Sequence, residues 1–187
     1  MLKELVKQNR SYRRFFEDKS ISEEQLLEFI DNARLTPSAA NKQPIRYCYS
    51  CDAVRNAAIF PHLHWAAYLQ DWDGPAPGER PAGYIILLAP KGVNAACDEG
   101  IIAQTILLSA AEKGMGGCMI ANIDRTSLSD TLHIPDPYQI QLVIALGYPR
   151  ETVVIDDISA GDDIRYYRDE CRTHHVPKLR LKDVILN

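Results

Sequence analysis

The stretch that most constrains the fold reads GIIAQTILLSAA and covers residues 100–111. It contains no charged residue and belongs to a helix predicted from about Ala95 to Lys113. Its apolar side chains cover most of the circumference of that helix, so the helix must be buried on most sides. It is therefore a core helix, a subunit interface, or both. Gly114 is suited to end it as a C-cap glycine.

Shorter helices and strands are expected on both sides of this central helix. Ser22 and Gln25 have capping-box spacing, which predicts a helix that ends before Pro37. The remaining expected elements are helices over 53–60 and 126–133 and strands over 45–51, 84–89, 117–120 and 139–146. Few of these strands are close enough in sequence to form tight hairpins. The order of elements indicates an α/β or α+β layered fold.

The segment 151–187 is charged and weakly patterned. Only a short strand or helix over 163–167 and a last turn over 181–186 are predicted in it. An irregular tail of this length would fray on its own, so we expect it to wrap over the body or over a partner subunit. Residues 165–168 (Arg-Tyr-Tyr-Arg) are expected either to contact that partner or to decorate the tail.

Length and composition limit the class of protein. The 187 residues suit one domain, 1–187, and the 46% hydrophobic and 25% charged fractions are those of a soluble globular protein. The formal net charge of −4 argues against a general nucleic-acid binder. The sequence has neither a signal-peptide core nor the run of about 20 apolar residues that spans a bilayer. We expect a cytoplasmic protein without nucleic-acid or membrane partners.

Cysteines and histidines do not indicate a metal site. The five cysteines are an odd number, which argues against a disulfide framework. Cys48 and Cys51 form a C-x-x-C pair, but it falls in a predicted strand, where positions three apart point to opposite faces. His62, His64 and the pair 174–175 are expected to be surface or lid residues.

A basic segment, NRSYRRF at residues 9–15, runs against the acidic balance of the chain. It holds three arginines and a serine within five residues. A guanidinium offers paired donors that match a phosphate, and a serine adds a short neutral donor. Lys178 and Arg180 form a second basic cluster near the other end. The alternative interpretation is a solvated basic turn.

Two loops carry further polar and aromatic side chains. The loop PSAANKQP at residues 37–44 has donors and acceptors suited to the amide-like edge of a heterocycle or to a polyol, although such residues also favour turns. The loop over 62–81 contains Trp65, Tyr68 and Trp72. A long loop of this kind in a compact domain is usually functional, often a lid.

Five motifs together resemble, in order and spacing, the FMN-dependent nitroreductase family. They are the basic segment, the 37–44 loop, GMGGCMIANID at 114–124, LGYP at 146–149 and VPKLR at 176–180. The resemblance implies an α+β, nitroreductase-like sandwich with a mostly antiparallel central sheet flanked by helices. It also implies a homodimer with exchanged C-terminal tails and two FMN sites at the subunit interface.

The resemblance further implies an FMN-dependent NAD(P)H oxidoreductase. In its ping-pong cycle NAD(P)H reduces FMN, and the flavin then reduces a nitroaromatic compound, a quinone or a similar acceptor. No catalytic side chain is required, because the cofactor carries the electrons. The alternatives are a flavin or enone reductase or a reductive dehalogenase of the same fold, and a non-catalytic FMN-binding module.

The resemblance also assigns site residues. The phosphate and ribityl end of FMN would meet Arg10, Ser11, Lys178 and Arg180, and the pyrimidine edge would meet Arg13. The flavin would also be reached by Pro37, Ser38, Asn41 and Gln43, partly from the partner subunit. Its face or central edge would meet Ile120, Ala121 and Asn122. Substrate would meet Trp65, Tyr68 and Trp72, which are equally suited to fill core.

The charges fit these assignments. FMN phosphate carries about two negative charges, and each charge-assisted hydrogen bond to it is worth about 1.5–3 kcal/mol. A cation beside the pyrimidine ring stabilises the anionic reduced flavin. Three positions depart from the family pattern: Asn9 stands where a basic residue is frequent, Ile45 replaces a tryptophan, and Ala121 replaces an acid found in some members. These departures bear on substrate range more than on FMN binding.

Overall fold

The computed structural model describes residues 2–186, so Met1 and Asn187 lie outside it. Its centre is a four-stranded sheet with strand order β1-β2-β4-β3, in which every neighbouring pair is antiparallel. The strands are Arg46–Ser50 (β1), Gly83–Pro90 (β2), Gly116–Ile120 (β3) and Tyr138–Gly147 (β4). The expected antiparallel central sheet is therefore confirmed.

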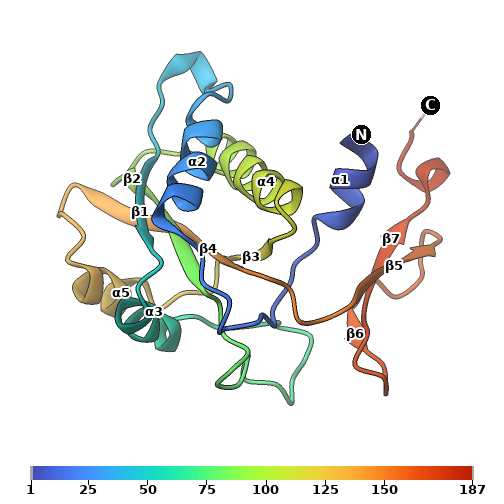
Figure 1. Cartoon of the computed structure of the whole chain (residues 1–187). Coiled ribbons are helices and arrows are strands. Elements are labelled where there is room, and N and C mark those ends of the chain that lie inside the picture. Colours follow the sequence, from blue (N-terminus) through green and yellow to red (C-terminus); the bar gives the residue numbers. More distant parts are fainter. Residues whose placement is uncertain (1, 187) are drawn as a thin grey trace.

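Helices cover both faces of this sheet (Figure 1). One face packs against α2 (Glu23–Arg34) and α4 (Ala96–Glu112), and the other lies over α3 (Ala53–Ile59) and α5 (Arg125–Leu132). Because successive side chains of a strand point to opposite faces, Ile85 and Leu87 enter one core cluster and Tyr84 and Ile86 enter the other. The sandwich with an α+β order of elements follows directly from this alternation.

The helices begin and end close to where the sequence predicts. The capping box before α2 is present: the Gln25 amide donates to Ser22 Oγ over 3.2 Å, and the Ser22 amide donates to Gln25 Oε1 over 2.9 Å. Helix α4 buries Ile102, Ile106 and Leu107, as its apolar sequence requires. Single 3₁₀ turns lie at Ala39–Asn41, Phe60–His62 and Leu181–Asp183. Among residues 2–186, no helix has the length and apolar character needed to cross a bilayer.

The N-terminal segment joins the edge of the central sheet. After α1 (Leu2–Gln8), the Tyr12 amide donates to the Gly117 carbonyl over 3.0 Å, and Ser11 forms a parallel bridge with Gly117. A side chain at the neighbouring Gly116 would collide with the Tyr12 ring, so glycine there permits the close approach of the N-terminal segment.

The C-terminal tail does not form the irregular segment that we expected. It forms a second, three-stranded sheet of order β5-β7-β6, built from Val153–Ile158 (β5), Tyr167–Arg168 (β6) and His174–Leu179 (β7). The predicted element over 163–167 is wrong, apart from its last residue. We call residues 150–186 the arm; it stands beside α1, away from the central sheet (Figure 1).

Two features of the arm hid its strands from sequence analysis. Strand β5 contains the acidic pair Asp156 and Asp157, and β7 contains Pro177, which normally argues against a central strand. In the structure β6 pairs only with His174 and His175, so β7 has β5 alone as its neighbour at Pro177. A proline is tolerated on an unpaired side of a strand, which resolves the conflict.

Candidate functional site

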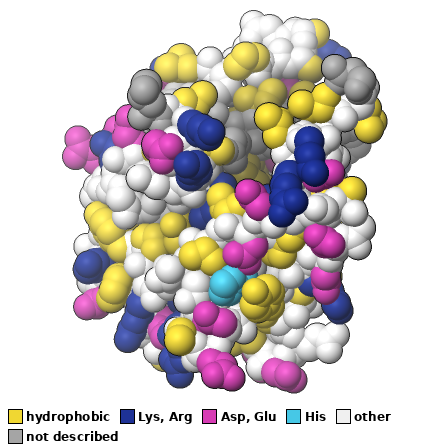
Figure 2. Space-filling model, turned by 90° about the vertical axis from the view of Figure 1, so that its right-hand side faces the viewer, with side chains coloured by type: hydrophobic (Ala, Val, Ile, Leu, Met, Phe, Trp, Pro, Cys, Tyr) yellow, Lys and Arg dark blue, Asp and Glu magenta, His cyan; other side chains and the backbone are white. Residues whose placement is uncertain are grey.

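The N-terminal basic segment and the arm meet at a cavity of about 380 Å³, which we call the basic cavity. Its polar lining consists of Asn9, Arg10, Ser11, Arg13, Gln104, Tyr166, His174 and Lys178, and its apolar lining of Leu107, Met119 and Val176. No acidic residue is part of this lining, so positive charge is in excess. On the face of the molecule that carries α1 and the arm, lysine and arginine side chains lie among acidic and hydrophobic ones (Figure 2).

Two cations of the basic cavity, Arg10 and Lys178, have side-chain donors without hydrogen-bond partners among the described residues. Arg10 donates from one terminal nitrogen to the Val6 carbonyl over 2.7 Å, while its buried Nε has no partner among the described residues. Burial also lowers the pKa of Arg10, which marks a charge that an anion would stabilise. Within residues 2–186, the ammonium group of Lys178 makes no hydrogen bond or ion pair. This donor set fits a doubly charged phosphate.

The Arg13 side chain lies between the basic segment and the arm, and it contacts both. Its side chain is 9% exposed, and Nη1 lies 3.0 Å from His174 Nε2 and 3.3 Å from the Ser11 carbonyl. The guanidinium carbon lies 4.7 Å from the centroid of the Tyr166 ring. Arg13 is therefore fixed by the basic segment on one side and by the arm on the other.

His174 is fully buried, so the prediction that it is a surface or lid residue is wrong. The ring is covered by Tyr166, whose centroid is 5.3 Å away, and it faces Arg13. Burial, followed by the nearby charges of Arg13 and Arg168, lowers the pKa of His174 to about 4. The imidazole is neutral at pH 7, and its Nε2 can accept the Arg13 hydrogen bond.

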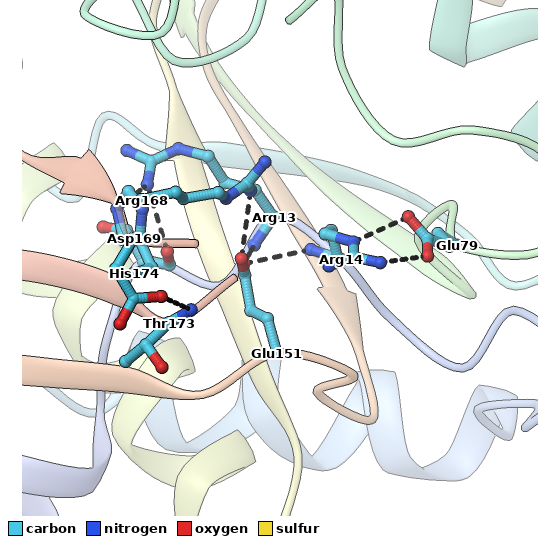
Figure 3. Close-up of polar contacts among 9 residues, drawn as sticks. Arg13, Arg14, Glu79, Glu151, Arg168, Asp169, Thr173 and His174 are labelled. Atoms are coloured by element: carbon cyan, nitrogen blue, oxygen red, sulfur yellow. Dashed lines mark hydrogen bonds and ion pairs between the residues drawn. The ribbon is translucent and has the colours of Figure 1, made fainter. Parts of the chain in front are cut away.

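Glu151, at the start of the arm, ties the basic segment in place (Figure 3). Its fully buried carboxylate accepts from the Arg13 amide, from the Arg14 amide over 3.1 Å and from Arg168 Nη2 over 3.0 Å. Arg14 turns the other way and makes a bidentate pair with Glu79, with Nε and Oε2 2.7 Å apart. Sequence analysis missed Glu151, because an acid in a charged tail gives no signal of burial.

The polar loop 37–44 lies at a different place on the protomer. Pro37, Ser38 and Gln43 line a cavity of about 250 Å³ together with Asp98 of α4. The loop backbone is left-handed at three non-glycine residues: φ is 49° at Ala40, 54° at Asn41 and 48° at Gln43. Such conformations persist only where the surroundings enforce them.

Asp98 of α4 holds the loop in this conformation, and sequence analysis did not identify it as a site residue. Its carboxylate, 3% exposed, accepts from the Ser38 hydroxyl and from the Ala39 amide over 3.1 Å. The hydrogen bond from Ser38, followed by that from Ala39, holds the pKa of Asp98 below its usual value. Ser38 Oγ in turn accepts from the Gln43 amide over 2.8 Å, and the Asn41 side chain accepts from Gln43 Nε2 over 3.1 Å.

The other assigned residues do not line the basic cavity of the same protomer. Ile120 is buried at the end of β3, the Ala121 carbonyl accepts from Arg125 over 3.0 Å, and the Asn122 carbonyl accepts from the His64 amide over 3.0 Å. Arg180 donates to Ser159 Oγ over 3.3 Å. One protomer thus brings together Arg10, Ser11, Arg13 and Lys178 from the whole assigned set.

The aromatic residues of the 62–81 loop contact the core and the arm. Trp65 is 8% exposed and belongs to the core cluster under α3 and α5. Tyr68 packs on Tyr166, with ring centroids 5.0 Å apart. The Arg168 guanidinium lies 4.2 Å from the Trp72 ring. The position of Trp65 agrees with the core-filling alternative, and Tyr68 and Trp72 attach the loop to the arm.

Comparison with known proteins identifies the family. The model of the nitroreductase family matches residues 6–148. A Methanothermobacter thermautotrophicus protein, named as a candidate NADH dehydrogenase/NAD(P)H nitroreductase, is 26% identical over 178 residues, covering 86% of this chain and 84% of that protein.

Solved structures share the fold. A nitroreductase family protein from Streptococcus pneumoniae superposes with a TM-score of 0.68 at 18% identity, covering 81% of this chain and 92% of that one. One from Clostridium novyi gives 0.65 at 24% identity, with 80% and 86% covered. An NADPH:FMN oxidoreductase from Vibrio harveyi, complexed with NAD+, gives 0.62 at 20% identity, with 79% and 68% covered. The chain belongs to the nitroreductase family.

Proposed function

We propose that this member of an oxidoreductase family is an FMN-dependent NAD(P)H oxidoreductase that works as a homodimer. The observation that carries the proposal is the basic cavity, where Arg10, Ser11 and Arg13 meet Lys178 from the far end of the chain. When bound, FMN would accept a hydride from NADH or NADPH and pass reducing equivalents to a nitro compound, a quinone or a similar acceptor.

The side chains of the basic cavity would hold the phosphate end of the cofactor. Lys178 and the unpartnered Nε of Arg10 offer charged donors, and Ser11 offers a neutral hydroxyl. Hydrogen bonds between charged donors and a phosphate are the strong ones, about 1.5–3 kcal/mol each. With no acid among the lining residues, no carboxylate competes for these donors.

Arg13 would act on the electrostatics of the reaction. Its guanidinium is fixed by neutral His174, by the Ser11 carbonyl and by the face of Tyr166, so it cannot swing away into solvent. A preorganised cation beside the pyrimidine edge would stabilise the negative charge that develops there on hydride transfer. The chain needs no general acid or base for this role.

A second protomer would complete the site. Loop 37–44, which Asp98 holds in a strained conformation, lies apart from the basic cavity of its own chain and is free to serve the partner's cavity. Several large apolar side chains near the end of the arm are exposed, as expected of a segment that packs on another copy: Leu179, Leu181, Val184, Ile185 and Leu186. A homodimer would cover them and bring both parts together.

The test is spectroscopic. We expect purified protein to elute as a dimer, to bind FMN with a yellow absorbance, and to lose that colour when NADH or NADPH is added without air. We expect Arg13→Ala and Lys178→Ala to weaken FMN binding by about one to two orders of magnitude, the loss of a charged hydrogen bond. Exposed Lys91, which follows β2 and lies outside both the cavity lining and the arm, provides the control Lys91→Ala.

The outcomes separate the alternatives. A flavin that neither nicotinamide bleaches would favour a non-catalytic FMN-binding module. Acceptor assays on the bleached protein would distinguish nitro or quinone reduction from flavin reduction, enone reduction and reductive dehalogenation. Protein that stays colourless with added FMN, or a stable active monomer, would overturn the proposal.

A further inference from the structure

We infer that Glu151 is a positioning residue, whose buried carboxylate sets the backbone of the phosphate-binding segment and so governs how firmly the cofactor phosphate is held. The inference rests on the proposed FMN site. It assigns a role to a residue of the arm that lies beyond the part of the chain matched by the family model, residues 6–148.

The contacts of Glu151 are directed at main-chain groups of the basic segment. One carboxylate oxygen accepts from both the Arg13 and the Arg14 amide, and the other accepts from Arg168 over 3.0 Å. These two amides have no other partner among the described hydrogen bonds. Removing Glu151 would therefore leave two partly buried donors unsatisfied, and the segment would have to move to find new acceptors.

Holding both amides also decides which arginine faces the cavity. Arg13 points to His174 and the basic cavity, whereas Arg14 points to Glu79 (Figure 3). The two side chains are neighbours of the same type, so the sequence itself does not distinguish them. Because one oxygen fixes both amides, the segment cannot rotate to exchange the two guanidinium groups without breaking these bonds.

The charge of Glu151 is balanced within the arm and loop. Arg168, whose side chain is 16% exposed, pairs with the fully buried carboxylate and lies over the ring of Trp72. A buried carboxylate without its partner cation is strongly destabilised, so the ion pair with Arg168 is needed to hold the Glu151 side chain in place. The positioning of the basic segment thus depends on contacts from the 62–81 loop through the arm.

Glu151→Gln tests the inference, because it keeps the shape of the side chain and removes its charge. Glu170→Gln is the matched control, since Glu170 is an exposed arm residue with no partner among residues 2–186. Affinities for FMN and for riboflavin, which lacks the phosphate, are measured by flavin fluorescence titration. We expect Glu151→Gln to lower the ratio of FMN to riboflavin affinity by about tenfold or more, and Glu170→Gln to leave it unchanged.

Amide exchange in the flavin-free protein provides a second readout. We expect the amides of residues 13 and 14 to exchange faster in Glu151→Gln than in the wild type, and equally fast in Glu170→Gln. Should Glu151→Gln fail to fold, Arg168→Lys replaces it; this variant keeps the positive charge but loses the guanidinium geometry, and it should shift both readouts in the same direction by less.

The inference is overturned if the wild type prefers FMN over riboflavin and the folded variants keep both that preference and the slow exchange of these amides. A wild type that binds neither flavin would instead overturn the proposed function. In that case the exchange measurement still reports whether Glu151 holds the segment, so the two failures are distinguishable.

Discussion

In β2 of the central sheet seven of eight residues are buried, whereas β5 of the arm has no fully buried residue. The central sheet is covered on both faces by helices and is held by apolar packing. The arm is held by charges and rings: Glu151 with Arg168, His175 with Asp156, and Tyr166 with Tyr68. The central sheet and its helices therefore supply most of the stability. The arm supplies the cations Lys178 and Arg168, which lie beside the basic segment.

A matched pair of substitutions tests whether the central sheet contributes more to stability than the arm does. Ile144 in β4 is fully buried, while Ile155 in β5 is 39% exposed. We expect Ile144→Ala to lower the free energy of unfolding by about 2–5 kcal/mol, through lost burial and the cavity left behind. Ile155→Ala should lower it by about 1 kcal/mol or less, since much of that side chain already meets solvent.

Urea denaturation of both variants, followed by circular dichroism, measures the difference. An equal loss of stability in the two variants would mean that the arm is packed as tightly as the body, contrary to its exposure. In that event Ile155 would be covered by the partner subunit of the proposed homodimer, and the contrast between central sheet and arm would hold for one protomer only.

The same contrast explains how much of the fold was predictable. Helix α4 and strands β2 and β4 were identified because long apolar runs bounded by turn residues indicate burial in a core. Strands β5 and β7 were missed because their acidic residues, histidines and Pro177 carry no such periodicity. Their pairing depends on partners distant in sequence, such as Val153 with His174, which no local pattern records.

Some residues of the candidate site were predicted from the sequence and others were not, for the same reason. The four residues that line the basic cavity, Arg10, Ser11, Arg13 and Lys178, were named from motif order and from the chemistry of their side chains. Glu151, Asp98 and His174 were not, because what distinguishes them is burial. An acid or a histidine in a polar stretch has the same local pattern whether it is buried or solvated.

Asp98 of α4 has the same kind of role for the 37–44 loop that Glu151 of the arm has for the basic segment. It accepts hydrogen bonds from Ser38 and Ala39, as Glu151 does from Arg13 and Arg14, so each of the two functional segments has its own buried acid. We expect Asp98→Asn to raise the amide exchange rate of Ala39 about tenfold, since a neutral acceptor holds the loop less well. In the flavin-free protein we expect a smaller change in the amides of the basic segment, because the loop lies apart from that segment within one protomer.

Asp31→Asn is the control for that experiment, because Asp31 is an exposed acid of α2 whose partner is Arg34 of the same helix. Exchange that rises equally in the basic segment and in the loop would show that the two segments are coupled, either within one protomer or across the proposed homodimer. Asp98 and Glu151 would then not act independently on the 37–44 loop and the basic segment.

The smallest effect we expect lies within the arm, where two adjacent histidines should respond to pH with opposite signs. His175 lies 2.8 Å from Asp156 and 3.4 Å from Asp169, and it stacks on Tyr167 at 4.6 Å. The hydrogen bond to Asp156, more than that to Asp169, raises the pKa of His175. Its stabilising charge is therefore complete below the ordinary value of about 6.5 and is lost as pH rises through the raised value.

His174 acts in the opposite sense, because its pKa is lowered to about 4 by burial and by Arg13 and Arg168. Between about 6.5 and that value the unfolded chain binds a proton that the folded chain excludes, so stability falls as pH falls. We expect His175→Gln to lower stability at acidic pH and to have little effect once pH exceeds the raised pKa of His175, and His174→Gln to flatten the loss of stability toward acid. Thermal unfolding of both variants from pH 4 to 8 measures this. Identical pH profiles for the two variants would mean that both rings meet the same solvent, and the enclosure of Arg13 by the arm would no longer explain its fixed position.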